Sequence, residues 1–235
     1  MNLVIRLKWL ISAACAKRAK YLTKSCKAKP YRWLLAALLI TSQGVFAAKT
    51  PTILVYGDSL SAGYGLKAEQ AWPRLLETEL QRRGKSFQII NASVSGETTA
   101  GGLTRFAAIQ NKYPAQLLIL ALGANDGLRG LPTQAMQDNL AKIIRRAQSK
   151  GTTVHLVGIQ IPPNFGPQYT RAFTASYQKL AKEFQLSFTP FLLAPIVQNN
   201  ALFQADQLHP TAPAQPLIMQ GVLQDLLKQQ AALFK

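Results

Sequence analysis

Three polar side chains of this sequence have the types and the order that nucleophilic catalysis needs. Ser59 follows the apolar run 53–56 and Gly57, so a buried strand is expected to deliver its hydroxyl into a sharp turn. A serine hydroxyl is a weak nucleophile, and it needs a base such as the imidazole of His209. Asp206 precedes His209 by three residues, and its carboxylate can orient that ring. The set predicts a serine hydrolase, although each motif alone is also typical of an ordinary turn.

Two further polar residues are expected to have structural roles. His155 lies between apolar residues of a predicted strand, so we expect a packed imidazole there rather than a second base. Asp58 is adjacent to Ser59, and side chains of adjacent residues point in different directions. We therefore predict that Asp58 braces the loop and that Asp206 is the carboxylate that acts with His209.

Apolar segments of strand length alternate with amphipathic segments along the chain after residue 48. Strands are predicted at 53–56, 87–90, 117–122, 154–159 and 187–191, and helices at 73–80, from Thr98 or Thr99, and at 132–150, 168–184 and 214–233. This alternation implies parallel strands with helices on both faces of the sheet. The predicted fold is α/β, a three-layer α/β/α sandwich of about five strands. The polar loops that follow the strands then share one edge of the sheet.

The first 47 residues have the three parts of a secretory signal peptide. Basic residues up to Arg32 precede the apolar stretch 33–40, and the small-residue segment 44–48 follows. We predict cleavage near Ala47, an enzyme domain over residues 48–235, and a periplasmic or secreted protein without a stable membrane anchor after cleavage. Because the apolar stretch is shorter than the roughly 20 residues that span a bilayer, a retained anchor is the less favoured alternative.

The charge and the cysteines are concentrated in the same leading segment. Of the 27 Lys and Arg residues, 9 lie in residues 1–47, which contain no acidic residue; the other 18, against 10 acidic residues, give +8 for residues 48–235. These basic residues are scattered, so nucleic-acid binding is not predicted. Cys15 and Cys26 both precede the predicted cleavage site, which argues against a catalytic cysteine, a cysteine metal site or a disulfide in the enzyme domain.

Four short blocks of the sequence, in this order, resemble those of the SGNH (GDSL) hydrolase family. The blocks are Gly-Asp-Ser-Leu-Ser at 57–61, Ser-Gly-Glu-Thr at 95–98, Gly-Ala-Asn-Asp-Gly at 123–127 and Asp-Gln-Leu-His at 206–209. The strings 60–64, 71–73 and 125–130 are similar to the exported bacterial branch of esterases, acyl-thioesterases and lysophospholipases. Ala124 departs from the glycine that this branch often has. With this resemblance the expected sheet is parallel and flavodoxin-like.

The resemblance implies a role for each of five residues. Ser59 is expected to be the nucleophile, His209 the base and Asp206 the orienting carboxylate. The backbone N–H groups of Ser59 and Gly96 and the side-chain amide of Asn125 are expected to form an oxyanion hole. Such a site transfers the acyl group to serine and then to water, and it requires no metal or organic cofactor.

The substrate class implied by the resemblance is a small-molecule or lipid ester: aryl esters, acyl thioesters and lysophospholipids. Leu128, Phe165 and Leu208 are candidates to line a groove for the acyl chain, although each is also a normal packing residue. A carbohydrate O-acetylesterase is the main alternative. A noncatalytic lipid- or carbohydrate-binding module is an alternative of another class. We expect a monomer with no partner other than its substrate.

Overall fold

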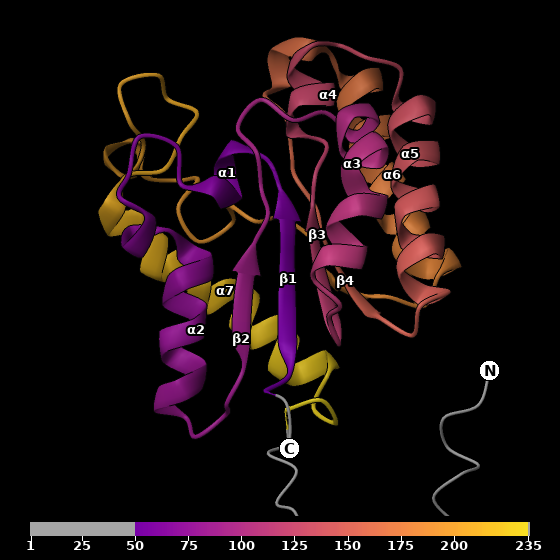
Figure 1. The fold of residues 1–235 in the computed structure, drawn as a ribbon. Helices are drawn as coiled ribbons and strands as arrows, with labels where there is room; N and C mark the ends of the chain where they lie inside the picture. Colours follow the sequence, from indigo (N-terminus) through magenta and orange to yellow (C-terminus); the bar gives the residue numbers. More distant parts are fainter. Residues whose placement is uncertain (1–49, 235) are drawn as a thin grey trace, which may run out of the picture. The chain divides into compact units, whose positions relative to one another are not determined.

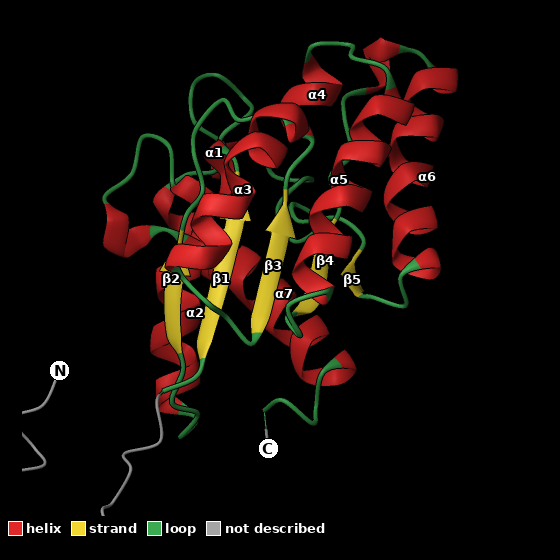
Figure 2. Cartoon of the chain, turned by 45° about the vertical axis from the view of Figure 1, so that its right-hand side comes forward, coloured by secondary structure: helices red, strands yellow, loops and turns green. Residues whose placement is uncertain are grey.

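Five parallel strands form the central sheet of the chain (Figures 1 and 2). The computed structural model describes residues 50–234, so the predicted signal peptide and both cysteines lie outside the described residues. The strands are β1 (Thr52–Gly57), β2 (Gln88–Asn91), β3 (Leu117–Ala121), β4 (Thr153–Val157) and β5 (Ser187–Thr189). Their order is β2-β1-β3-β4-β5, and every pairing is parallel. This is the flavodoxin-like order, so the predicted sheet is confirmed.

Helices cover both faces of this sheet and complete the predicted three layers (Figure 1). Helices α3, α5 and α6 pack side by side on one face, whereas α2 and α7 pack together on the other. Helices α1 and α4 are short and lie at the carboxyl edge of the strands. The bounds are α1 (Ser59–Ala62), α2 (Trp72–Arg82), α3 (Thr99–Lys112), α4 (Ala124–Leu128), α5 (Thr133–Gln148), α6 (Pro167–Glu183) and α7 (Gln215–Gln229).

The core follows from the apolar runs that predicted the strands. Every residue of β1 and β3 is buried, as expected for central strands with helices on both faces. In α5 the apolar stripe from Met136 to Ala147 faces this core. Gly151, directly after the predicted range 132–150, has φ +76°, and the chain turns back through hydrogen bonds to the carbonyls of Ala147 and Gln148.

Six predicted elements end earlier than the sequence indicates: β3 and α6 by one residue, β4, β5 and α5 by two, and α7 by four. Strand β5 stops at Thr189 rather than residue 191, because Pro190 has no N–H to donate to a strand ladder. Helix α7 stops at Gln229 rather than residue 233. The chain turns after it and places the buried ring of Phe234 against Phe87, at 5.1 Å between ring centroids.

Within residues 50–234, the helices are all too short or too polar to span a membrane.

Candidate active site

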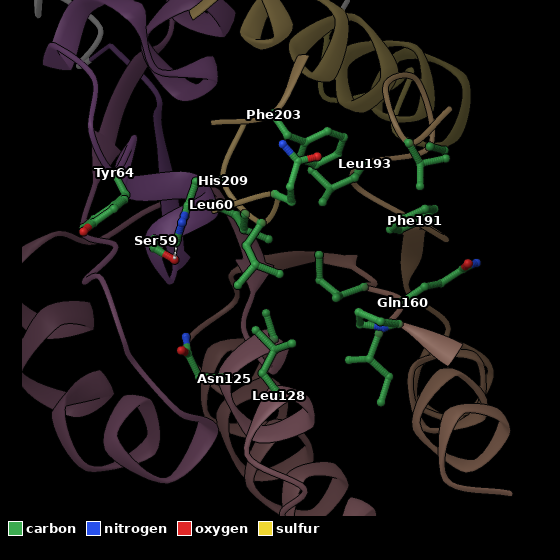
Figure 3. Close-up of a pocket in the computed structure, with 18 of the residues that line it drawn as sticks. Ser59, Leu60, Tyr64, Asn125, Leu128, Gln160, Phe191, Leu193, Phe203 and His209 are labelled. Atoms are coloured by element: carbon green, nitrogen blue, oxygen red, sulfur yellow. Dashed lines mark hydrogen bonds between the residues drawn. The ribbon is translucent and has the colours of Figure 1, made fainter. Parts of the chain in front are cut away.

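The loops at the carboxyl edge of the sheet bring the predicted site residues together. Ser59 begins α1 directly after β1, Gly96 lies in the loop after β2, and Asn125 lies in α4 after β3. Asp206 and His209 lie in the long segment between β5 and α7. Ser59, Gly96, Asn125 and His209 all line one pocket, and Figure 3 shows three of them around its polar end. A parallel sheet produces this convergence because all its strands end on the same side.

Three side chains form a continuous row of hydrogen bonds. His209 Nε2 lies 2.9 Å from Ser59 Oγ, and His209 Nδ1 lies 2.6 Å from Asp206 Oδ2 (Figure 3 shows the first contact). With the ring proton on Nδ1 directed to the carboxylate, Nε2 is free to accept the serine proton. The row therefore has the geometry of a nucleophile, a base and an orienting carboxylate.

Asp206 is held by its own loop. Its Oδ1 accepts hydrogen bonds from the backbone N–H groups of Leu208 at 2.9 Å and His209 at 3.0 Å. Three hydrogen bonds lower the pKa of Asp206 to about 2. In order of effect they come from the His209 backbone N–H, the His209 ring and the Leu208 backbone N–H. The carboxylate is therefore ionised at neutral pH and accepts the Nδ1–H of the imidazole.

Asp58 braces the start of α1, as the sequence predicted. It is the N-cap residue, and its Oδ1 accepts a hydrogen bond from the Leu60 N–H at 3.1 Å. The side chain is 1% exposed, and burial raises its pKa to about 7. Its Oδ2 has no hydrogen-bond partner among the described residues. Asp58 and Asp206 thus lie near the same serine in opposite electrostatic environments.

Two of the expected oxyanion donors, Gly96 and Asn125, are joined through the backbone of the loop after β2. Gly96 has φ +78°, a conformation that favours glycine. Glu97 directly follows Gly96, and its carbonyl accepts a hydrogen bond from Asn125 Nδ2 at 3.0 Å. The second N–H of the Asn125 amide is left for a ligand. Ala124, the departure from the branch pattern, is helical within α4, so its methyl group needs no special backbone conformation.

These polar groups belong to a pocket of about 940 Å³ whose lining is largely apolar (Figure 3). Leu128 and Leu208 line it, as expected from the sequence. Phe165, the third candidate, does not line this pocket: Pro162 and Pro163 do, while the turn 163–165 places the Phe165 ring near Tyr169, at 6.3 Å between centroids. Sequence analysis missed most of the remaining apolar lining, which includes Leu60, Ile159, Ile161, Phe191, Leu193, Ala194, Val197 and Phe203.

Comparison with known proteins places this site in a family. Residues 55–215 match the GDSL-like Lipase/Acylhydrolase family. This chain belongs to that family. It is 40% identical over 188 residues to Esterase TesA of Pseudomonas aeruginosa, an alignment that covers 80% of this chain and 92% of that protein. It is 38% identical over 195 residues to an arylesterase of Vibrio mimicus, covering 83% and 98% of the two chains.

Solved structures of GDSL relatives have the same fold. The crystal structure of TesA matches with a TM-score of 0.73 at 40% identity, covering 76% of this chain and 99% of that one. The psychrotrophic esterase EstA from Pseudoalteromonas sp. matches with a TM-score of 0.74 at 38% identity, covering 77% and 98%. The GDSL fold of this chain is thus supported by its sheet order and by its relatives.

His155 has the structural role that the sequence predicted. It is fully buried, with Nδ1 2.9 Å from Ser187 Oγ and Nε2 2.9 Å from Thr189 Oγ1. Burial lowers the pKa of this imidazole to about 3. It therefore remains neutral and links β4 to β5. Within residues 50–234, no group of three or more His, Cys, Asp and Glu side chains is placed to hold a metal ion.

Helix α4 is tied to the loop after β2 by residues that the sequence analysis did not select. Asp126 accepts from the backbone N–H of Thr99 at 2.8 Å and from its hydroxyl at 2.6 Å. Arg129 Nη2 donates to the carbonyl of Gly96 at 3.1 Å. These bonds fix the positions of Gly96 and Asn125 relative to each other. The available signal was their position in the sequence, because Asp126 belongs to the third GDSL block and Arg129 follows that block by two residues.

Gln204 is a second group that the sequence analysis missed. Its side-chain Nε2 donates to the carbonyls of Tyr64 at 2.8 Å and Pro210 at 3.0 Å, and its backbone N–H donates to the carbonyl of His209 at 2.7 Å. Tyr64 follows α1, and its ring packs at a tilt against the His209 ring, at 4.5 Å between centroids. Gln204 therefore connects the loop that carries His209 to the segment that carries Ser59. No pattern in the sequence indicates this contact.

The Asp58→Asn variant should change how stability depends on pH. Because the folded state retains a proton that the unfolded state releases, the free energy of unfolding of the wild type should fall as pH rises from about 4 to 7, by up to about 4 kcal/mol. Asparagine cannot ionise, so this variant should show a smaller fall. Urea unfolding between about pH 4 and 7 measures the free energy of unfolding of each protein. Asp138→Asn, which removes an exposed carboxylate, is the control. Parallel curves for wild type and Asp58→Asn would contradict the assignment.

Removal of the Gln204 amide should lower turnover of a soluble ester. We expect Gln204→Ala and Gln204→Glu to reduce kcat by about 10- to 100-fold with little change in KM, because a displaced imidazole no longer meets the serine. Glutamate fills the same volume but cannot donate to the two carbonyls. Gln134→Ala, whose side chain bonds only Asp138 on α5, is the control. Wild-type turnover by Gln204→Glu would show that the amide only fills space.

Proposed function

We propose that this chain is a serine esterase and thioesterase that cleaves aryl esters, acyl thioesters and lysophospholipids through an acyl-enzyme. The observation that carries the proposal is the row Asp206, His209 and Ser59, which meets a largely apolar cavity of about 940 Å³ at the serine. The row supplies a nucleophile, and the cavity has the size and lining for an acyl chain.

The first half of the reaction acylates Ser59. Its Oγ attacks the carbonyl carbon of the ester while His209 Nε2 takes the hydroxyl proton, which gives a tetrahedral oxyanion. The carbon then loses the alcohol or thiol, which takes the proton from Nε2 as it leaves. Asp206 stabilises the imidazolium that exists between these two proton transfers. In the second half a water molecule attacks the acyl-serine by the same route and releases the acid.

The oxyanion is stabilised by three N–H donors: the backbone amides of Ser59 and Gly96 and Asn125 Nδ2. All three residues line the pocket at its polar end. The bonds from Asn125 to Glu97 and from Arg129 to Gly96 hold the donors before substrate arrives. Donors fixed in advance stabilise the developing charge without reorganising during the reaction.

The names of the relatives support the same substrate class. They are an esterase, an arylesterase and the thioesterase 1/protease 1/lysophospholipase L1 of Escherichia coli K12, which is 36% identical over 196 residues. The solved structure of EstA is described as inhibited by monoethylphosphonate. A phosphonate ester resembles the tetrahedral intermediate of acyl transfer, so this supports a nucleophilic mechanism in the family.

The leading segment supports a proposal about location. Residues 1–47 act as a signal peptide that is cleaved near Ala47, and residues 48–235 act as the enzyme in the periplasm or outside the cell. The support is the order of basic, apolar and small residues in the sequence. An exported enzyme meets lipid and aryl esters more readily than cytosolic acyl-CoA.

Hydrolysis of nitrophenyl esters from acetate to palmitate tests the activity. We expect kcat/KM to rise by up to about fourfold for each CH₂ that the apolar pocket buries, until the pocket is filled. Ser59→Ala should abolish turnover at every length, since it removes the attacking oxygen. Activity confined to acetate would instead favour a carbohydrate O-acetylesterase, and equal activity of Ser59→Ala would overturn the mechanism.

Substitution of Asn125 tests the oxyanion donor. Asn125→Ala should lower kcat by about 100- to 1000-fold with a small change in KM, because the side chain acts mainly on the transition state. Asn125→Asp keeps the shape but replaces the donor by an acceptor, so its loss should be at least as large. Thermal unfolding of both variants checks that the loop remains folded. A loss below about threefold in Asn125→Ala would remove Asn125 from the oxyanion hole.

A further inference from the structure

Exposed apolar side chains are concentrated around the mouth of the pocket. Of the seven large apolar side chains that are exposed within residues 50–234, six lie in segments at the carboxyl edge of the sheet. We call these six the apolar rim: Tyr64, Val94, Leu128, Leu131, Val197 and Leu208. The seventh, Leu217, lies on α7 and does not line the pocket. Apolar side chains clustered at one opening, unlike single ones, indicate an interaction surface.

The rim is continuous with the interior of the pocket. Four of its members also line the pocket. Val94 directly precedes Ser95, which is another lining residue, and Leu131 follows Leu128 by three positions. The members come from the segments after β1, β2, β3 and β5, so they approach the opening from several sides. An acyl chain could therefore pass from an apolar exterior into the pocket without crossing water.

The position of the rim decides which occupant it fits. A second copy of the chain or another protein seated on the rim would cover Tyr64, Leu128, Val197 and Leu208, which line the same pocket as Ser59. A lipid layer seated on the same side chains would instead supply the substrate itself, for example a lysophospholipid with its one acyl chain. The charge of residues 48–235, +8, favours a layer with anionic headgroups. Two exposed basic residues, Lys67 and Arg129, lie in the rim segments, three positions after Tyr64 and directly after Leu128.

We propose that the apolar rim docks on the surface of a lipid layer that contains anionic phospholipid, and that the ester enters the pocket from this layer. The proposal rests on the proposed function, since it assumes an acyl ester as substrate. It adds that the enzyme takes this substrate from an aggregate, with the rim side chains inserted among the headgroups.

Vesicle binding tests the docking surface without hydrolysis. Ser59→Ala protein is sedimented with vesicles of equal parts phosphatidylglycerol and phosphatidylcholine. We expect binding, and about tenfold weaker binding when Val94→Ser and Leu131→Ser are added, because two apolar side chains no longer leave water. Leu217→Ser in the same background should bind as Ser59→Ala does. Absent binding, or equal binding by the rim and control variants, would overturn the proposal.

Kinetics separate this proposal from the proposed function. Neither Val94 nor Leu131 lines the pocket, so the double variant with Ser59 intact should hydrolyse soluble nitrophenyl butyrate at the wild-type rate. Its rate on lysophospholipid embedded in the same vesicles should fall about tenfold. Wild-type protein that hydrolyses the soluble ester but does not bind vesicles would refute the docking surface alone. Wild-type protein inactive on every ester would refute the proposed function, and a stable dimer disrupted by the rim substitutions would assign the rim to a second copy.

Discussion

The hydrogen bond between Ser59 Oγ and His209 Nε2 joins two side chains 150 positions apart, and the proposed chemistry depends on it. The bond is possible because a central strand, β1, ends two residues before Ser59, and the segment after the edge strand β5 returns to the same edge of a parallel sheet. Gln204 connects the two segments through the Tyr64 carbonyl, at the point where the loops meet. Helices packed on both faces hold the strands, while hydrogen bonds between loops hold the reacting atoms.

Two aspartates close to Ser59, Asp58 and Asp206, have different pKa values and different roles because their surroundings differ. Asp58 is buried with one oxygen unpartnered, and burial raises its pKa to about 7. Asp206 is partly exposed and accepts three hydrogen bonds, which lower its pKa to about 2. Only Asp206 therefore carries a negative charge over the whole range from weakly acidic to neutral pH. Asp58 instead caps the short helix that presents the serine.

The pocket recognises the ester group through directional hydrogen bonds and the alkyl chain through non-directional apolar contacts. At one end, fixed N–H donors and the imidazole face the position of the ester group, and small displacements there are costly. Beyond it, apolar side chains from four loop segments accept an alkyl chain by excluding water, which imposes little chemical selectivity. This division is consistent with a family whose members carry the names esterase, arylesterase and thioesterase. The apolar rim extends the non-directional contacts to the surface.

The patterns of the sequence by themselves determined the fold class, and its resemblance to the SGNH (GDSL) family implied the flavodoxin-like sheet and the residues that carry the proposed chemistry. Buried strands read as unbroken apolar runs, so local patterns were sufficient for the fold, whereas Ser59, Asn125 and the pair Asp206 and His209 were selected because the short motifs that contain them resemble those of the family. Only the tertiary structure decided that Phe165 lies outside the pocket, that residues such as Ile161 and Phe203 line it, and that Gln204 joins the two loops. These facts depend on the direction of side chains in irregular loops and on contacts between distant segments. Neither leaves a periodic pattern in the sequence, because loop conformation is set by packing rather than by a repeat.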